Sequence, residues 1–454
     1  MNALLTDLYQ LTMAAGYFEA GKIGETATFE LFVRKLPHNR NFLVCAGLAQ
    51  AVEYLLNFSF SSEELAWLRT LPQFAKASPA FFDYLSQLRF TGDLFAMPEG
   101  TPVFPGEPIL TVRAPLVEAQ IPETFLLSTI AFQTLIATKA ARIVEIAGGR
   151  SVVEFGTRRA HSPQAGVLAG RAAYIGGCTG TSNTLTGMQF GIPVFGTAAH
   201  SWVQTFEHEI DSFRSLQELL GPNTVYLIDT YDTLEGARRA ASLGAPIWGV
   251  RIDSGDLLEM STAVRRILDQ AGLKQTRIMA TSDLNEYKIA ELLAANAPID
   301  AFGVGTDLAT SADVPSLSAV YKIVELRHGD HRRYTAKFSE GKRTLAGAKQ
   351  VFRFSGQDIV GSSSECIGCL PGGEPAEALL RPVILNGSLV EPLPNVHHAR
   401  GRALERVKRL PSSLRTLFEA KDPWPVNYSK ELLALNDEVR RSLEQEESHE
   451  DGLR

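Results

Sequence analysis

Cysteine is scarce in this chain of 454 residues. The four cysteines are Cys45, Cys178, Cys366 and Cys369. Because so few cysteines cannot cross-link a chain of this length, the composition predicts a protein of a reducing compartment. Cys366 and Cys369 are close enough to share a metal ion, but no second cysteine pair exists, and His397 and His398 are their only companions. Ordinary loop thiols are therefore the better interpretation, with a zinc site as the alternative.

Dense basic runs and long apolar runs are also lacking. The formal net charge is −7 and no stretch is rich in Lys and Arg, so the sequence has no electrostatic footprint for nucleic acid. An acidic substrate would need local basic residues. No run of about 18 apolar residues occurs, and residues 1–7 lack a basic stretch that leads into an apolar one. We therefore expect a cytoplasmic protein without a membrane partner.

The common nucleotide-binding loops are missing as well. No Gly-x-Gly-x-x-Gly motif opens a strand-to-helix turn, and no Walker-type loop is present. Instead, six short apolar runs alternate with helical stretches, and each run ends in charged, hydroxyl and glycine residues. The ends are residues 154–159, 196–201, 229–232, 251–256, 281–283 and 303–307. This alternation predicts a parallel sheet or barrel, in which the carboxyl ends of the strands share one face, so we expect the six clusters to form one site.

The length predicts more than one domain, because a single hydrophobic core stops growing at roughly 250–300 residues. Alternation in residues 27–34, prolines among the apolar stretches of 90–112 and a hairpin over 320–338 predict an antiparallel sheet built from both sides of the barrel. We expect the charged tail from Gln445 to be disordered. The predicted segments are 1–120 for the N-terminal domain, 121–318 for the barrel, 319–400 for strands that rejoin the first domain, and 401–454 for a helical segment and tail.

A glycine-rich loop follows the last predicted barrel strand. Gly303, Gly305 and Thr306 come after the strand-like residues 299–302, and their backbone amides could converge on an anion, since glycine permits close approach. Phosphate is the natural ligand of such a loop, and phosphate sites are frequent late in barrels. A tight turn explains the two glycines equally well, so the neighbouring clusters have to decide.

Several acids and one arginine belong to the same predicted face. Arg251 and Asp253 lie two residues apart at a strand end, hence on one side of the pleat. The guanidinium could bind a phosphate with two hydrogen bonds, and the carboxylate could bind ribose hydroxyls or magnesium; a structural ion pair is the alternative. Asp229, Asp232 and Asp283 add carboxylates. Together these groups indicate a sugar-phosphate site with magnesium rather than a redox cofactor site.

Two histidines and two further arginines lie at the predicted barrel mouth. His161 and His200 would each serve as well for a helix cap as for a catalyst, but His200 opens a helix-like stretch, where the helix dipole favours a bound anion. Arg158 and Arg159 could supply positive charge beside Phe155. The ring of Phe155 could equally be part of the core.

At these clusters the chain resembles nicotinate phosphoribosyltransferase. The similar stretches are LTDLYQLTM at 5–13, EFGTRRA at 154–160, GTSN at 180–183, GTAAHSW at 196–202, RIDSGD at 251–256 and TSDL at 281–284. They occur in order within the part of the chain from about residue 4 to residue 353. The resemblance implies a type II phosphoribosyltransferase of the α/β class. In such an enzyme an irregular α/β barrel is joined to an open-faced sheet (α+β) domain, and two subunits form a head-to-tail homodimer with shared active sites.

The resemblance also implies the reaction. Nicotinate and phosphoribosyl pyrophosphate would give nicotinate mononucleotide and pyrophosphate, coupled to the hydrolysis of ATP, as the first step of NAD salvage from nicotinate. Magnesium would enter with phosphoribosyl pyrophosphate, near Asp229 and Asp253, rather than being fixed by the protein alone. The C-terminal third matches less clearly than the rest.

Residue roles follow from the matching motifs. On the side of the base, Phe155 and the partner subunit's Tyr9 would lie on the two faces of the pyridine ring. Arg158 would reach the nicotinate carboxylate or nearby phosphates, and Thr181 and Ser182 would line the base site. The residues implied for ribose, pyrophosphate, magnesium and the 5′-phosphate are Asp229, Arg251, Asp253, Asp283, Gly303, Gly305 and Thr306. His200 would be phosphorylated by ATP and discharged during turnover.

Three rival functions remain. The similar nicotinamide enzymes carry an acid where Ser182 stands, and such an acid would favour an amide and repel a carboxylate. Quinolinate, with its second carboxylate, would call for more cations, and its family lacks the motifs of Tyr9 and His200. A non-catalytic nucleotide sensor on the same scaffold would be expected to have lost one of the acids or the histidine, yet all are present.

Overall fold

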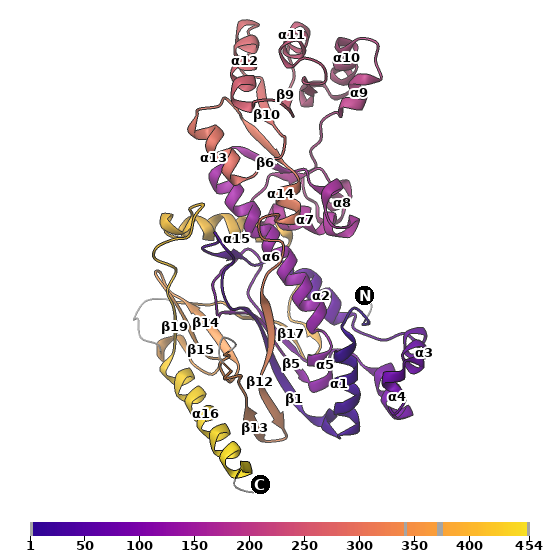
Figure 1. Cartoon of the computed structure of the whole chain (residues 1–454), viewed down its shortest axis with the longest axis vertical. Coiled ribbons are helices and arrows are strands. Elements are labelled where there is room, and N and C mark those ends of the chain that lie inside the picture. The colour runs from indigo at the N-terminus through magenta and orange to yellow at the C-terminus, as the bar shows by residue number, and fades with distance from the viewer. Residues whose placement is uncertain (1–2, 340–342, 370–375, 452–454) are drawn as a thin grey trace. The chain divides into compact units, whose positions relative to one another are not determined.

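The computed structural model describes residues 3–339, 343–369 and 376–451; the side chains of Cys369 and of residues 446–451 are outside this description. The chain divides into two compact units (Figure 1). Unit 1 consists of Met1–Thr134, Ser316–Pro394 and Phe418–Arg454. Unit 2 consists of Leu135–Pro315 and Asn395–Leu417. The division falls within the long helix α6, Glu123–Ile146.

Unit 1 is built on a seven-stranded sheet of order β13-β12-β1-β5-β3-β17-β18. The strands are β1 (Thr26–Val33), β3 (Asp93–Ala96), β5 (Pro108–Pro115), β12 (Ala319–His328), β13 (His331–Tyr334), β17 (Arg381–Leu385) and β18 (Ser388–Leu389). Strand β1 pairs antiparallel with both β5 and β12. The predicted hairpin of residues 320–338 is therefore formed by β12 and β13, and it does rejoin the N-terminal sheet, as Figure 1 shows.

Strand β1 is buried on both faces, although its sequence alternates. Its polar positions Thr28 and Glu30 are only 2% and 1% exposed. Glu30 is neutralised by Lys349, whose Nζ lies 2.8 Å from Oε2 of Glu30. Lys349 belongs to a second, four-stranded sheet of order β16-β14-β15-β19. Buried charges need such partners, and this ion pair explains how an alternating strand fits inside the unit.

The remaining elements of unit 1 are helices and short strands. They are α1 (Leu8–Glu19), α2 (Leu48–Leu56), α3 (Ser62–Thr70), α4 (Pro79–Gln87), α5 (Leu116–Gln120), α16 (Lys430–Asp451), β2 (Leu43–Val44), β4 (Pro102–Val103), β14 (Lys349–Arg353), β15 (Asp358–Ser362), β16 (Glu377–Ala378) and β19 (Val426–Tyr428). Asp7 is the N-cap residue of α1, but its side chain accepts a hydrogen bond from Thr124 instead of capping the helix. Because α16 continues to Asp451, the prediction of disorder from Gln445 is wrong.

Unit 2 contains a six-stranded sheet of order β7-β6-β11-β10-β9-β8, in which every paired neighbour is parallel. The strands are β6 (Ser151–Glu154), β7 (Gly180–Thr181), β8 (Val225–Leu227), β9 (Gly249–Ile252), β10 (Arg277–Ala280) and β11 (Ala301–Val304). The helices are α7 (Pro163–Ile175), α8 (Thr184–Phe190), α9 (His200–Gln204), α10 (Glu209–Leu220), α11 (Thr233–Leu243), α12 (Leu257–Gln270), α13 (Glu286–Ala294), α14 (Thr306–Thr310) and α15 (Val396–Arg409). The predicted α/β class is confirmed.

Five of the six predicted clusters follow a strand of this sheet, namely β6, β8, β9, β10 and β11. The cluster at 196–201 is different, because Val194 before it forms only an isolated parallel bridge with Thr181 of β7. Pro193 has no backbone N–H to donate, which limits pairing at this edge of the sheet.

The helical run Leu116–Ile146 is apolar and long enough to cross a membrane by length and composition alone. Yet 61% of its most apolar window is buried inside the protein. Leu126, Ile130 and Ile136 on this run are at most 1% exposed. The core helix of a soluble protein has these same properties, so the run is weak support for a membrane span.

Candidate active site

A cavity of about 630 Å³ lies among the loops that follow the strands of unit 2. The predicted site residues that line it are Phe155, Arg158, Ser182, His200, Arg251, Asp253, Asp283, Gly303, Gly305 and Thr306. They come from segments far apart in the sequence, and the parallel order of the strands brings them to one edge of the sheet. Five of the six clusters thus line one space, as the alternation of strands and helices predicts, whereas the cluster at 229–232 contributes no lining residue.

Three predicted residues lie elsewhere. Thr181 is fully buried behind the cavity, and its hydroxyl donates to Oε2 of Glu154 at 2.6 Å. Asp229 supports the cavity from behind, because its Oδ2 accepts hydrogen bonds from the backbone N–H of Asp253 at 2.9 Å and from the hydroxyl of Ser254 at 2.5 Å. Tyr9 belongs to α1 of unit 1 and is 49% exposed.

Asp232 and His161, which the sequence predicts to lie at the mouth of the barrel, also do not line the cavity. Asp232 is the N-cap of α11, where its Oδ1 accepts from the backbone N–H of Glu235 at 2.8 Å. His161 is exposed and does not line the cavity. Arg159, in contrast, lines it together with Arg158.

Arg251 is held in place by three groups. Its Nε donates to Thr281 at 2.9 Å, its second nitrogen donates to Thr197 at 2.8 Å, and its third lies 2.8 Å from Oδ1 of Asp253. The ion pair that the strand-end spacing allows is therefore formed. Only 13% of the Arg251 side chain and 24% of the Asp253 side chain are exposed, so the pair is a rigid part of the cavity wall.

The charge state of Asp253 is set by these contacts. Burial alone would raise the pKa of Asp253, but hydrogen bonds from Thr281 and Arg251 and the positive charge of Arg251 outweigh it, and the pKa is lowered. Asp253 is therefore an anion at neutral pH. Its other oxygen, Oδ2, lies 3.7 Å from Nε2 of His200.

Phe155 presents an aromatic ring to the cavity next to Arg251, whose guanidinium carbon lies 5.9 Å from the ring centre. Gly303 makes room for this ring. A Cβ atom at Gly303 would lie 2.6 Å from Cδ2 of Phe155 and 2.6 Å from the methyl carbon of Thr281. Gly303 lies within β11 rather than after it, and it has a packing function in addition to any function of its backbone amide.

The loop after β10 has an unusual backbone. Ser282 has φ +89° and Asp283 has φ +46°, although neither is glycine. Such conformations cost of order 1–3 kcal/mol each and persist only where the surroundings impose them. Both residues line the cavity, so the strain lies at the site itself.

Glu154 is an important residue of this site that the sequence argument does not identify. It is fully buried at the end of β6, where it accepts hydrogen bonds from Thr181 and from the backbone N–H of Gly156. Burial raises the pKa of Glu154, and these two hydrogen bonds oppose the rise. Because the contact joins β6 to β7, Glu154 aligns Phe155 with Ser182. The signal in the sequence is its place directly before Phe155.

Unit 1 has a larger cavity, of about 910 Å³. Its basic lining residues are Arg34, Lys337, Arg343, Lys349 and Arg440. None of the predicted site residues lines it. Volume alone does not identify an active site; the predicted residues gather in unit 2, where an aromatic ring, arginines, carboxylates and a histidine line one space.

Metal-ligand clusters are not found among the described residues, where no group of three or more His, Cys, Asp and Glu side chains could hold an ion. Cys45 and Cys178 are buried and form no disulfide bond. The alternative of a zinc site at Cys366 and Cys369 falls outside the described residues, because the side chain of Cys369 is not among them.

Comparison with known proteins gives the family. The model of the nicotinate phosphoribosyltransferase (NAPRTase) N-terminal domain matches residues 4–131, and the model of the NAPRTase family matches residues 150–331. A nicotinate phosphoribosyltransferase of Mycobacterium tuberculosis is 44% identical over 446 residues, which cover 95% of this chain and 93% of that protein. One of Bacillus subtilis is 45% identical over 364 residues, 78% of this chain and 74% of that protein.

Solved structures agree. Human nicotinic acid phosphoribosyltransferase superimposes with a TM-score of 0.81 at 28% identity, covering 96% of this chain and 99% of that one. Nicotinate-nucleotide pyrophosphorylase from Pyrococcus furiosus gives a TM-score of 0.74 at 27% identity, covering 90% and 95%. Together with the cavity lined by carboxylates and arginines, these matches define a phosphoribosyltransferase. The chain belongs to the nicotinate phosphoribosyltransferase family, so the resemblance noted in the sequence is confirmed, and the protein is an enzyme of NAD biosynthesis.

Proposed function

We propose that the unit 2 cavity is the place where nicotinate attacks phosphoribosyl pyrophosphate to give nicotinate mononucleotide and pyrophosphate. The observation that carries this proposal is the arrangement of Phe155, Arg251 and Asp253 around one space, with the guanidinium 5.9 Å from the ring centre and 2.8 Å from the carboxylate. An aromatic surface for a pyridine therefore adjoins a cation and an anion suited to a sugar pyrophosphate.

The chemistry of glycosyl transfer requires both charges. As pyrophosphate leaves C1 of the ribose, positive charge develops on the sugar and negative charge on the leaving group. A fixed carboxylate near the sugar and a fixed guanidinium near the pyrophosphate stabilise this transition state more than the ground state. Asp253, ionised at neutral pH, and Arg251 have these roles in our proposal, and both are pre-positioned by Thr281.

The base is held by an aromatic ring and by polar groups. Nicotinate lies against Phe155, with its ring nitrogen directed at C1, and the partner subunit's Tyr9 covers its other face. Arg158 receives the carboxylate. Ser182, which lines the cavity without a charge, allows the carboxylate of nicotinate to enter. An acid at this position would repel it.

The phosphoribosyl part occupies the opposite side. In our proposal Asp283 and the backbone amides of Gly303, Gly305 and Thr306 take the ribose and the 5′-phosphate. All four residues line the cavity, which supports this placement.

Magnesium enters with phosphoribosyl pyrophosphate. The residues present fit such an ion, because Oδ1 of Asp229 is buried without a hydrogen-bond partner among the described residues, and Asp253 is an anion beside it. The ion would neutralise the pyrophosphate and help it leave. Since no set of three protein ligands exists among the described residues, most of its ligands would be substrate oxygens and water.

ATP is the co-substrate in our proposal, and His200 is its phosphoryl acceptor. The His200 side chain is 41% exposed at the start of α9 and lines the cavity. Its Nδ1 lies 3.1 Å from the hydroxyl of Thr230, which fixes the ring and leaves Nε2 directed at Asp253. A phosphoryl group on this histidine would add charge next to the pyrophosphate subsite and thereby couple ATP hydrolysis to binding of the second substrate.

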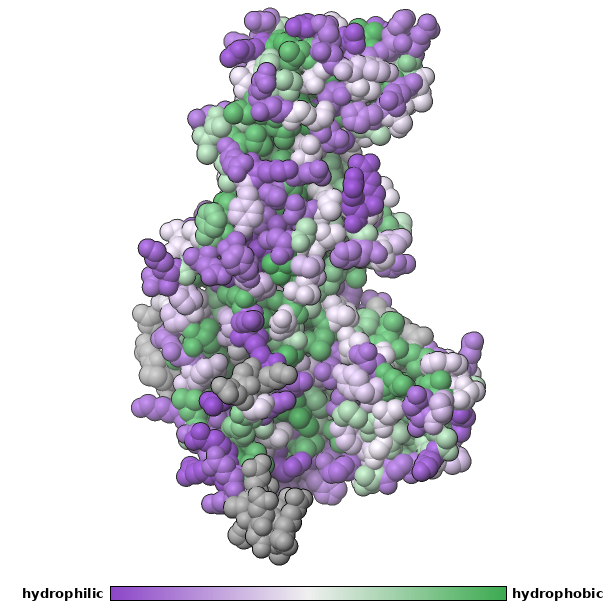
Figure 2. Space-filling model, viewed as in Figure 1, coloured by the Kyte–Doolittle hydropathy of each residue, from purple (hydrophilic) through white to green (hydrophobic). Residues whose placement is uncertain are grey.

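The working form in this proposal is a homodimer with shared sites, located in the cytoplasm. Helix α1 and the residues before it expose several large apolar side chains for such an interface. These are Leu5, Leu8, Tyr9 and Met13. Figure 2 shows hydrophobic surface among hydrophilic residues over the part of unit 1 where Figure 1 labels α1, α3 and α4. Exposed apolar patches of this kind mark protein interfaces.

The test is an assay of nucleotide formation from nicotinate and phosphoribosyl pyrophosphate with wild type, Arg251→Ala and Arg214→Ala. Arg214 is a matched control because it pairs with Asp211 on the exposed face of α10. We expect Arg251→Ala to lose roughly 10²-fold or more in kcat/KM, the size typical for removal of a group that stabilises transition-state charge, and Arg214→Ala to match wild type. Equal activity of the two variants would contradict the site. Binding of phosphoribosyl pyrophosphate by wild type without turnover would favour the sensor alternative.

A further inference from the structure

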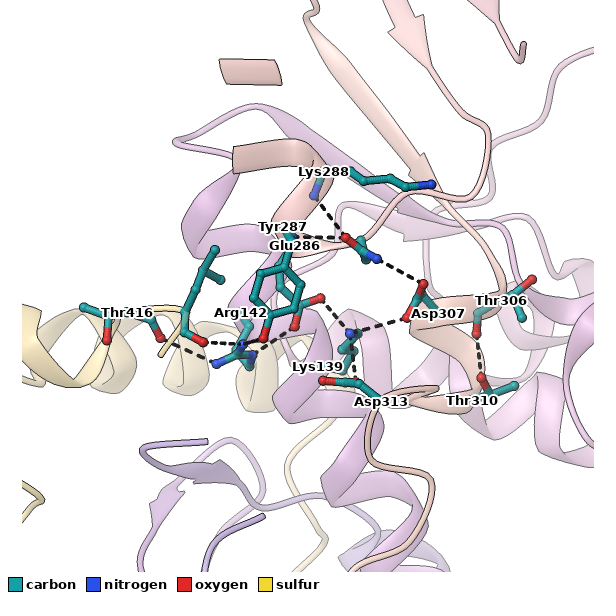
Figure 3. A network of polar contacts seen from close by, with 12 residues as sticks. Lys139, Arg142, Glu286, Tyr287, Lys288, Thr306, Asp307, Thr310, Asp313 and Thr416 are labelled. Carbon is teal, nitrogen blue, oxygen red and sulfur yellow. Dashed lines mark hydrogen bonds and ion pairs between the residues drawn. The ribbon is translucent and has the colours of Figure 1, made fainter. Parts of the chain in front are cut away.

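A cluster of charges around a buried lysine lies next to Thr306, one of the cavity-lining residues (Figure 3). Its centre is Lys139 of α6, whose side chain is only 1% exposed. Nζ of Lys139 lies 2.6 Å from Oε2 of Glu286, 2.9 Å from Oδ1 of Asp313 and 3.6 Å from Oδ1 of Asp307. Placing an ammonium group in the protein interior is costly unless it is paired, so these three carboxylates and Lys139 depend on one another.

The cluster reaches the cavity through Asp307. This residue is adjacent in the chain to Thr306, which lines the cavity, and both belong to the single-turn helix α14. Oδ2 of Asp307 also accepts a hydrogen bond from Asn285 at 3.3 Å. The loop of Gly305 and Thr306, two residues that line the cavity, is therefore tied to α6 by a charged contact.

The same cluster supports the strained loop after β10. Glu286 begins α13, and Asn285 before it caps that helix by accepting from the backbone N–H groups of Tyr287 and Lys288. Nζ of Lys288 donates to the backbone oxygen of Asp283 at 2.9 Å. The hydrogen bond from Lys288 on α13 thus helps to hold the left-handed conformation of Asp283. The buried Lys139 in turn holds Glu286, the first residue of the same helix.

We propose that Lys139 is a positioning residue for the phosphoribosyl side of the cavity, acting through Asp307 and Glu286 on the loops of Thr306 and Asp283. The proposal rests on the function proposed above, in which these loops bind the ribose and the 5′-phosphate. Lys139 itself does not line the cavity. Its loss changes the shape of the phosphoribosyl subsite and leaves the base subsite, built on Phe155 and Ser182, in place.

The experiment compares steady-state kinetics of Lys139→Met and Arg142→Met. Arg142 is the matched control: it follows three residues later on α6, is 5% exposed, and bonds the same Glu286 through Nε at 3.0 Å. Its guanidinium also donates to the carbonyl oxygens of Thr416 and Leu417 and to the hydroxyl of Tyr287. We expect Lys139→Met to raise the KM for phosphoribosyl pyrophosphate at least about tenfold, with the KM for nicotinate changed less than about threefold. Arg142→Met should lower the melting temperature without this selective rise in the KM for phosphoribosyl pyrophosphate.

A second pair of variants keeps the test valid if Lys139→Met does not fold. Asp307→Ala and Asp313→Ala each remove one partly exposed carboxylate from the same lysine, but only Asp307 adjoins Thr306. We expect only Asp307→Ala to raise the KM for phosphoribosyl pyrophosphate. Where Lys139→Met folds, we also combine it with Asp307→Ala. The KM of this double variant for phosphoribosyl pyrophosphate should be no higher than that of the single variant with the higher KM, because the two residues act as one unit.

Three results would overturn the proposal. They are an unchanged KM for phosphoribosyl pyrophosphate in Asp307→Ala, equal rises in Asp307→Ala and Asp313→Ala, or an equal rise in Arg142→Met and Lys139→Met. Wild type is assayed first with nicotinate. Turnover there establishes the reaction independently of Lys139, so failure of the positioning role and failure of the proposed function give different results.

Discussion

Nε2 of His200 lies 3.7 Å from Oδ2 of Asp253, on the opposite side of the imidazole from the hydroxyl of Thr230. Oδ1 of the same carboxylate contacts Arg251 at 2.8 Å. One aspartate therefore lies between the histidine that we assign to ATP and the arginine that we assign to pyrophosphate. A phosphoryl group on Nε2 would add negative charge beside Asp253, and this charge would be felt directly by the groups around the second substrate.

The first prediction concerns this histidine. His200→Asn should retain some nucleotide formation but lose ATPase activity and stimulation by ATP, because the imidazole that accepts the phosphoryl group is gone. Wild type incubated with ATP labelled at the terminal phosphate should give an acid-labile, base-stable phosphoprotein. His161→Asn is the control, since His161 is exposed and does not line the cavity. Stimulation by ATP that survives in His200→Asn would show that the histidine is structural.

The second prediction concerns the dimer. If Tyr9 completes the partner's site, mixing inactive Tyr9→Ala with inactive Arg251→Ala protein should restore activity, because one of the two shared sites in each heterodimer is then intact. Activity is measured after subunit exchange has been verified with differently tagged chains. Mixtures that stay as inactive as their parents, despite exchange, would remove Tyr9 from the shared site.

The third prediction concerns the glycine under the aromatic ring. Gly303→Ala should raise the KM for nicotinate about tenfold or more, since the new Cβ atom, 2.6 Å from the Phe155 ring, forces the ring to move. Gly401→Ala is the control, because a Cβ atom at this position of α15 meets nothing within 4 Å. In that helix, alanine should stabilise the protein by up to about 1 kcal/mol. A Gly303→Ala enzyme with the wild-type KM for nicotinate would contradict the packing role.

The fourth prediction concerns pH and unit 1. Glu107 is fully buried, and burial together with the negative charge of Asp358 raises the pKa of Glu107 well above its usual value. A carboxyl group whose folded-state pKa is raised stabilises the fold at pH values below its unfolded-state pKa, and this contribution is lost as the pH rises through the folded-state pKa. Glu107→Gln imitates the protonated acid. Its melting temperature should therefore fall less than that of wild type between pH 5 and pH 8.

Glu405→Gln is the control for this experiment, since Glu405 is exposed on α15. If the melting temperatures of wild type and Glu107→Gln change with pH in parallel, the pKa of Glu107 is not raised by folding, and the prediction is contradicted. Arg353, which donates hydrogen bonds of 2.6, 2.9 and 3.2 Å to the carboxylate of Asp358, is unchanged in both variants.

The sequence predicts the parts of this fold that depend on local pattern. Buried parallel strands read as apolar runs, and the residues after them, such as Asp253 and Gly305, face one cavity because the strands are parallel. The prolines among the apolar stretches of 90–112 and the hairpin over 320–338 locate strands of the antiparallel sheet, because both are local patterns. The tail from Gln445 is predicted wrongly, because charges at helical spacing, such as Arg440 and Glu444, support a helix that composition alone does not indicate.

Contacts between distant residues could not be predicted. Lys139 in the middle of an apolar helix has no local sign of its partners Glu286 and Asp307, which are more than 140 positions away. Glu154 is read as the polar end of a strand, whereas it is a buried link between β6 and β7. Such pairs become visible only when the sheet order is known, because the order decides which strand ends are neighbours.

The most direct measurement compares kcat/KM of the purified enzyme for nicotinate, nicotinamide and quinolinate, each with phosphoribosyl pyrophosphate, magnesium and ATP, and repeats the series with Ser182→Asp. Our account predicts that nicotinate is used far better than the other two bases, because the uncharged Ser182 and the guanidinium of Arg158 accept one carboxylate. It also predicts that Ser182→Asp loses nicotinate activity by repulsion between like charges in a confined site. Equal turnover of nicotinate and nicotinamide by wild type, or full nicotinate activity in Ser182→Asp, would contradict it.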